Sequence, residues 1–160
     1  MEKLTILCVD DQRDVLRAIA RDMSEFESWT EVEECESADE ALGVLADVEE
    51  QGRPLALIIC DHVMPGLLGV DFLARIEKSS RHKHVKKVLI TGHASHVDTI
   101  NAINFAGVDA YVSKPWSSAD LQKTCRRLLT QYLFDAGLDV ENYRSVMDPE
   151  IMLQRMSGMD

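Results

Sequence analysis

The chain has 160 residues, of which 46% are hydrophobic and 28% charged, and its formal net charge is -11. This composition is that of a globular domain with enough apolar residues for one packed core. The acidic balance argues against nucleic acid and anionic membranes as partners, because both are bound through lysine and arginine. The start lacks a signal-peptide pattern, and no stretch approaches the ~18 apolar residues of a transmembrane helix. We therefore expect a cytoplasmic protein.

Short apolar runs alternate with amphipathic stretches and predict the strands. The runs cover residues 4–9, 30–35, 55–60, 88–90 and 110–112. The first and third runs are continuously apolar, which is typical of parallel strands covered on both faces. The second run is more polar, so we expect it at the edge of the sheet.

Helical spacing of apolar residues fills the gaps between these runs. Val15, Leu16, Ile19 and Met23 predict the first helix, and Ser37 to Glu40 is a capping box for the second. The remaining helix starts follow proline or a capping serine, at Pro65, Ser95 and Ser117, and Gly107 fits a helix end.

Five strands alternating with five helices predict an α/β fold, a doubly wound parallel sheet with helices on both faces. The flavodoxin-like strand order 2-1-3-4-5 suits five strands with a single switch point. In such sheets ligands bind beyond the carboxyl ends of the strands, at the switch point between the first and third strands.

Polar residues follow the predicted strands at those ends. Asp10 and Asp11 follow the first strand, Asp61 the third and Thr91 the fourth, and Lys114 comes just after the fifth. All of them would meet at one edge of the sheet. Carboxylates this close repel one another, and a divalent cation would neutralise them. Magnesium suits such ligands, because it is commonly held by one or two carboxylates together with waters and phosphate oxygens.

The same residues predict phosphoryl transfer. With Mg²⁺ and Lys114 the site is near neutral, so it can accept a phosphoryl group, which needs an in-line nucleophile and positive charge on its oxygens. Asp61 offers the nucleophile, and the Thr91 hydroxyl adds to the stabilisation. Taken alone, each of these residues could equally be part of a turn, the end of a strand or a solvated surface charge. Only their joint placement at one sheet edge favours a phosphoryl-transfer site.

Residues 3–131 resemble the receiver domains of two-component response regulators, chemotaxis regulators included. The resemblance lies in an ordered set of motifs: Asp10-Asp11, Asp61-His62-Val63-Met64-Pro65, Gly69, Thr91-Gly92, Tyr111 and Lys114-Pro115.

The resemblance implies a role for each motif. A histidine kinase or phosphotransfer protein would phosphorylate Asp61, and Asp11, Asp61 and the Val63 carbonyl would bind Mg²⁺ with help from Asp10. Thr91 and Lys114 would hold the phosphoryl oxygens, and Tyr111 would change rotamer when Thr91 moves. The protein would be a signalling switch that catalyses only its own phosphorylation and dephosphorylation.

Residues 1–131 are the predicted receiver domain, and residues 132–160 a C-terminal helical extension or linker too short for its own core. Val140, Tyr143, Val146 and Met147 predict one short helix there, and Pro149 starts another. The extension is acidic, so DNA binding within this chain is not expected. The chain is either a single-domain regulator or the front part of a longer protein.

Two other functions compete with the switch. An aspartyl phosphatase typically has a second Asp two residues after its nucleophile, where this chain has Val63 or Gln12. A pure binding module would have no need of the intact acidic site. We therefore predict a switch in which residues 95–130 change conformation and bind a downstream protein, a fused output domain or a second copy.

Two further expectations concern the segment after the fifth strand. The Lys114-Pro115 bond is a candidate cis peptide, since proline lowers the cis penalty to about 0.5–1 kcal/mol. A cis bond would turn the Lys114 ammonium towards the phosphoryl oxygens. Trp116, at the edge of the predicted output surface, is a candidate aromatic anchor for a partner.

Overall fold

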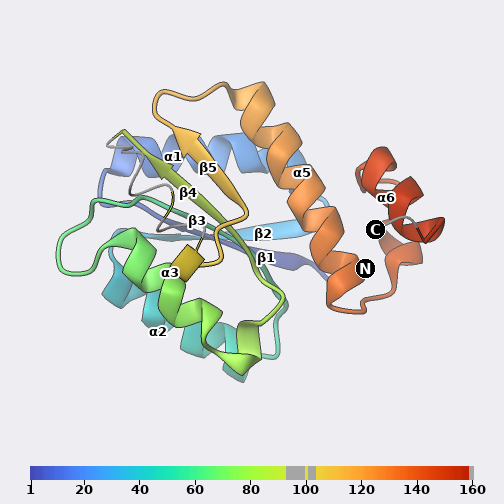
Figure 1. The fold of residues 1–160 in the computed structure, drawn as a ribbon, viewed down its shortest axis with the longest axis horizontal. Helices are drawn as coiled ribbons and strands as arrows, with labels where there is room; N and C mark the ends of the chain where they lie inside the picture. The colour runs from blue at the N-terminus through green and yellow to red at the C-terminus, as the bar shows by residue number, and fades with distance from the viewer. Residues whose placement is uncertain (93–99, 101–103, 159–160) are drawn as a thin grey trace.

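The structure, a computed structural model, describes residues 1–92, 100 and 104–158 (Figure 1). The strands are β1 (Leu4–Val9), β2 (Thr30–Cys35), β3 (Leu55–Cys60), β4 (Lys86–Thr91) and β5 (Ala110–Ser113). The helices are α1 (Arg13–Met23), α2 (Ala38–Glu50), α3 (Gly69–Glu77), α5 (Ser118–Asp135) and α6 (Pro149–Met156). Short 3-10 helices cover Ser24–Phe26, Ser80–His82 and Val140–Tyr143.

The strands form one parallel five-stranded sheet in the order β2-β1-β3-β4-β5. Helices α1 and α5 cover one face and α2 and α3 the other (Figure 1). The predicted strand order and the edge position of β2 are therefore confirmed. Strands β4 and β5 are longer than their apolar runs, because Lys86, Lys87 and Ser113 join the ladder.

Side chains of the central strands alternate between two cores. Leu4, Ile6 and Cys8 of β1 pack with α1 and α5, whereas Leu7 and Val9 pack with α2 and α3. All of these side chains are fully buried. This alternation explains the continuous apolar runs, because a strand covered on both faces needs apolar residues at every position.

Side-chain caps begin several helices where the sequence predicts them. The Ser37 hydroxyl accepts a hydrogen bond from the Glu40 N–H at 3.1 Å, and the Ser117 hydroxyl accepts one from Asp120 at 3.2 Å. Asp148 caps α6 at the Ile151 N–H, with Pro149 in the first turn. The cap predicted at Ser95 lies outside the described residues, although Ile100 is helical.

The C-terminal extension packs against the same core as α1 and α5. Tyr143 is 3% exposed, lies 6.2 Å from the Trp29 ring centroid, and donates its hydroxyl to the carbonyl of Glu2. The N-terminus accordingly lies beside α6 and the end of α5 (Figure 1). Buried Met147 belongs to the same core.

One expectation for the extension is wrong. The helix predicted through Val140, Tyr143, Val146 and Met147 stops at Tyr143 and is a 3-10 helix. A turn follows, in which the Val146 N–H donates to Tyr143 O at 3.0 Å. The turn lets Tyr143 and Met147 reach the core from a segment that is not α-helical. Helix α5 runs past residue 131 to Asp135, and the division into a domain and an extension stays a prediction.

None of the helices in the described part of the chain is long and apolar enough to cross a bilayer.

Candidate functional site

Two neighbouring strands bring the acidic residues together. Strands β1 and β3 pair in parallel, and the hydrogen bonding continues past their ends, where the Asp61 N–H donates to Val9 O at 2.9 Å. On the other side of β1 the Asp10 N–H donates to Cys35 O at 3.1 Å. Asp10 and Asp61 are thus held side by side by backbone bonds, at the predicted switch point.

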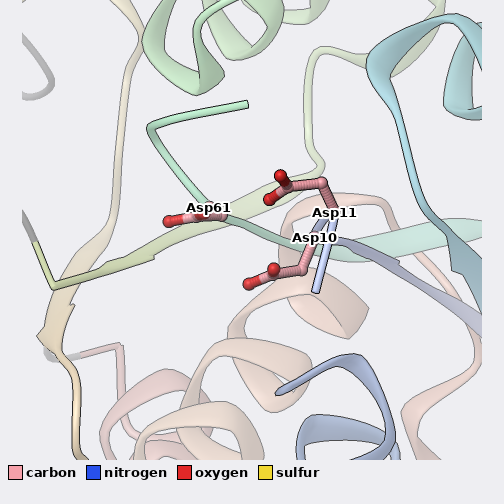
Figure 2. A group of neighbouring side chains, drawn as sticks. All are labelled: Asp10, Asp11 and Asp61. Carbon is pink, nitrogen blue, oxygen red and sulfur yellow. The ribbon is translucent and has the colours of Figure 1, made fainter. Parts of the chain in front are cut away.

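The three carboxylates form one cluster in which an oxygen of each lies within 4.8 Å of the others. Figure 2 shows Asp10, Asp11 and Asp61 pointing to the same side of the chain. Asp10 is 0% and Asp61 5% exposed, while Asp11 is exposed. At the 2.0–2.1 Å bonds of octahedral Mg²⁺, two ligand oxygens lie about 2.9 to 4.2 Å apart. The all-carboxylate donor set therefore suits this ion, and the 4.8 Å bound on the spacing of its oxygens is close to that range.

Lys114 brings a positive charge to the cluster. Its Nζ lies 2.9 Å from Asp10 Oδ2 and 3.4 Å from Asp61 Oδ1. Its backbone N–H donates to Thr91 O at 3.0 Å, which ties the residue to the end of β4. The Lys114-Pro115 peptide is cis, as the sequence predicts.

The buried position of Asp10 disfavours the ionised form of its carboxyl group. Burial raises the pKa of Asp10, and the charge of Asp61 adds to the rise, while the Gln12 N–H and Lys114 oppose it. The Gln12 N–H donates to Asp10 Oδ1 at 2.9 Å. A cation beside a buried carboxyl group favours its ionised form and so offsets the effect of burial.

The loop after Asp61 is held by a close backbone approach at the start of α3. The Gly69 N–H donates to His62 O at 2.7 Å, and a Cβ at Gly69 would meet the Asp61 carbonyl oxygen at 2.0 Å. Any other residue would therefore displace the loop that carries Asp61. The carboxylate itself accepts the His62 N–H at 2.9 Å.

A cleft of about 300 Å³ lies over the cluster. It is lined by Asp11, Gln12, Asp61, Val63, Gly92 and Lys114. Gln12 is a lining residue that the sequence did not single out, because a glutamine after two aspartates carries no distinctive signal.

The predicted switch residues lie on β4 and β5. Thr91 is fully buried and pairs with Ser113 in the sheet, and Tyr111 is half-buried opposite Leu89. Thr91 thus reaches the same sheet edge as Asp61, whereas Tyr111 lies further back along β5 and packs against the α2–α3 core.

The response regulator receiver domain family matches residues 6–126. A five-stranded parallel sheet of this order, with an acidic cluster at its switch point, is the architecture of that family, and the chain belongs to it.

Relatives and solved structures agree with this assignment. The chemotaxis protein CheY-3 of Vibrio cholerae is 30% identical over 125 residues, which cover 76% of this chain and 88% of that protein. A CheY-like receiver domain protein of Methanospirillum hungatei is 30% identical with a TM-score of 0.70, covering 84% of this chain and 99% of that one. The receiver domain of an HD domain-containing protein of Pseudomonas fluorescens is 27% identical with a TM-score of 0.72. The match covers 82% of this chain and 98% of that one.

Other relatives are longer than this chain. The hydrogenase transcriptional regulatory protein HoxA of Cupriavidus necator is 34% identical over 127 residues, which make up 79% of this chain and 24% of that protein. The chain thus spans about a quarter of the length of this relative.

The metal assignment leads to a prediction for Asp11. We expect Asp11→Asn to weaken Mg²⁺ binding about ten-fold or more, since a neutral amide replaces a charged ligand of a hard cation. Relief of carboxylate repulsion is expected to leave the metal-free protein at least as stable as the original. Titration of each variant with Mg²⁺, followed by NMR, measures the affinity. An unchanged Mg²⁺ affinity would place the ion elsewhere.

Proposed function

We propose that this protein is a phosphorylation switch in which Asp61 accepts a phosphoryl group. The observation that carries the proposal is the position of the Asp61 carboxylate. It lies on the floor of a cleft, 3.4 Å from the Lys114 ammonium and within 4.8 Å of two further carboxylates. Membership of the receiver family supports this role.

The reaction follows from this arrangement. An Asp61 carboxylate oxygen attacks the phosphorus of a phosphohistidine on a partner protein, so that an O–P bond forms and the P–N bond breaks. The electron pair of the P–N bond leaves with the imidazole, which takes up a proton from solvent. Lys114 balances charge on the phosphoryl oxygens, and the Thr91 hydroxyl donates a hydrogen bond to one of them.

Asp10, Asp11, Asp61 and the Val63 carbonyl are the proposed Mg²⁺ ligands. When bound, the ion neutralises negative charge on the carboxylates and the phosphoryl oxygens. Asp10 is buried and also holds Lys114 in place through the 2.9 Å contact. The metal-binding and phosphoryl-binding groups thereby share one charge network.

The proposed partners follow from the family. A histidine kinase or phosphotransfer protein is the donor, and a cytoplasmic location fits such a donor. The output is a downstream protein, a fused output domain or a second copy of the chain. The names of the relatives describe both chemotaxis and transcriptional regulation.

The test is incubation with acetyl phosphate and Mg²⁺, followed by intact-mass spectrometry. We expect addition of a single phosphoryl group that depends on Mg²⁺ and is lost on prolonged incubation. An aspartyl phosphatase would instead hydrolyse many donor molecules without a lasting mass addition, and a pure binding module would show neither mass addition nor donor hydrolysis.

Phosphorylation is further expected to change the surface formed by residues 95–130, of which 95–99 and 101–103 lie outside the described part of the chain. Thr91 ends β4, and Tyr111 lies on the neighbouring strand β5. A phosphoryl oxygen that draws the Thr91 hydroxyl inward frees space beside Tyr111, which biases two packings of that face by a few kcal/mol. NMR shift mapping with beryllofluoride, a phosphoryl mimic, measures the change. Shifts confined to the loop after Asp61 would leave the protein without this switch.

A further inference from the structure

Trp116 is tied to helix α1 by a hydrogen bond. Its indole Nε1–H donates to Asp22 Oδ2 at 2.7 Å, and Asp22 is 7% exposed. Trp116 is itself half-buried and packs against the core shared by α1 and α5. A short bond from an indole to a shielded carboxylate is charge-assisted, and such bonds are stronger than neutral ones. The indole N–H is therefore bonded within the chain, and the role of the Trp116 ring as an aromatic anchor for a partner stays a prediction.

Trp116 lies two residues after Lys114 and in the same loop. Between them stands Pro115, whose ring fixes the backbone φ and limits the freedom of the loop. A lysine side chain has a flexible four-carbon stem, so its ammonium is placed only as well as its backbone is. The backbone on either side of the Lys114 side chain is fixed by a hydrogen bond. The Lys114 N–H donates to Thr91 O, and the Trp116 indole N–H donates to Asp22 Oδ2.

Helix α1 connects Trp116 to the acidic pair. The helix begins at Arg13, directly after Asp10, Asp11 and Gln12, and Asp22 lies in its last turn. One rigid element thus carries the proposed metal ligands at one end and holds the Lys114 loop at the other. The 2.9 Å contact between Lys114 Nζ and Asp10 Oδ2 links the Lys114 loop directly to the residues that precede α1.

We propose that Trp116 is a positioning residue, which places the Lys114 ammonium for phosphoryl transfer through its hydrogen bond to Asp22. This inference rests on the function proposed above. Productive geometry matters because a misplacement of about 1 Å in a reacting group can cost on the order of 100-fold in rate.

A second hydrogen bond to Asp22 offers a matched control. Gln122 Nε2 donates to the Asp22 backbone carbonyl at 3.0 Å, but Gln122 lies within α5, beyond the loop. If the indole bond only fastens this part of the chain to α1, loss of either bond affects the protein in the same way. If the indole bond positions Lys114, only its loss slows the chemistry.

The experiment measures the rate of phosphorylation by acetyl phosphate and the thermal midpoint of each variant. Trp116→Phe and Asp22→Ala are expected to react about ten-fold more slowly than the original protein while remaining folded. Asp22→Asn keeps an acceptor oxygen and is expected to stay within about two-fold, as is Gln122→Met. The effect of Trp116→Phe is expected to vanish in a Lys114→Met background, because both changes act through one ammonium group.

The outcomes separate this inference from the function on which it rests. No phosphorylation of the original protein would overturn the proposed function, and the inference with it. Normal phosphorylation together with an unimpaired Trp116→Phe variant would overturn the positioning role alone. So would an equal slowing by Trp116→Phe with and without Lys114, since that result shows a path that bypasses the ammonium.

Discussion

Asp61→Asn is expected to take up no phosphoryl group from acetyl phosphate or from a phosphorylated histidine donor. The amide keeps the size of the side chain and an acceptor for the His62 N–H, which bonds to Asp61 Oδ1 at 2.9 Å. It lacks the anionic oxygen that attacks phosphorus, so the nucleophile is lost while the fold is kept. Intact-mass spectrometry over the time in which the original protein is fully modified measures the effect.

Asp71→Asn is the matched control for this variant. Asp71 is an exposed carboxylate in the first turn of α3, outside the cleft. We expect it to be phosphorylated at the rate of the original protein. Equal modification of Asp61→Asn and Asp71→Asn would show that the acceptor lies elsewhere in the chain.

Tyr143→Ala is expected to lower the free energy of unfolding by about 3–5 kcal/mol, the usual cost of removing a buried aromatic ring. Tyr143 is 3% exposed, although it comes from the C-terminal extension. Its ring lies against Trp29, and its hydroxyl bonds to the Glu2 carbonyl. If the extension is part of the cooperative unit, the loss is felt by the whole fold. Urea denaturation followed by far-UV circular dichroism measures it.

Two variants make that result interpretable. Tyr143→Phe loses only the hydroxyl and is expected to cost about 1 kcal/mol. Leu153 of α6 is 70% exposed, so Leu153→Ala is expected to change the free energy of unfolding by less than about 0.5 kcal/mol. A Tyr143→Ala variant as stable as Leu153→Ala would mean that the extension unfolds on its own and does not support the receiver fold.

Much of the fold is predictable because local patterns and tertiary demands agree. Strands β1 and β3 are buried on both faces, so their apolar runs are uninterrupted, and their bounds equal the predicted ones. Polar residues directly after such strands must lie at one sheet edge. This is why Asp10, Asp61 and Lys114 could be placed together before their distances were known.

What local patterns do not show is long-range pairing. Nothing in the sequence around Asp22 distinguishes it from other acidic residues on helices, yet it receives the Trp116 indole from across the fold. The extension was likewise expected to be a helix or linker, because apolar spacing does not show which surface a segment covers. Tyr143 reaches Trp29 only through the turn that follows the 3-10 helix.

Reduction of the phosphorylated protein with borohydride, followed by peptide mapping, tests the central claim most directly. Borohydride converts an aspartyl phosphate into homoserine and leaves unmodified aspartates intact. The predicted result is homoserine at position 61 and at no other aspartate, and only in samples that contained Mg²⁺ and the phosphodonor. Homoserine at position 10 or 11, or none at all in a protein that gained phosphate, would contradict the assignment of Asp61 as the acceptor.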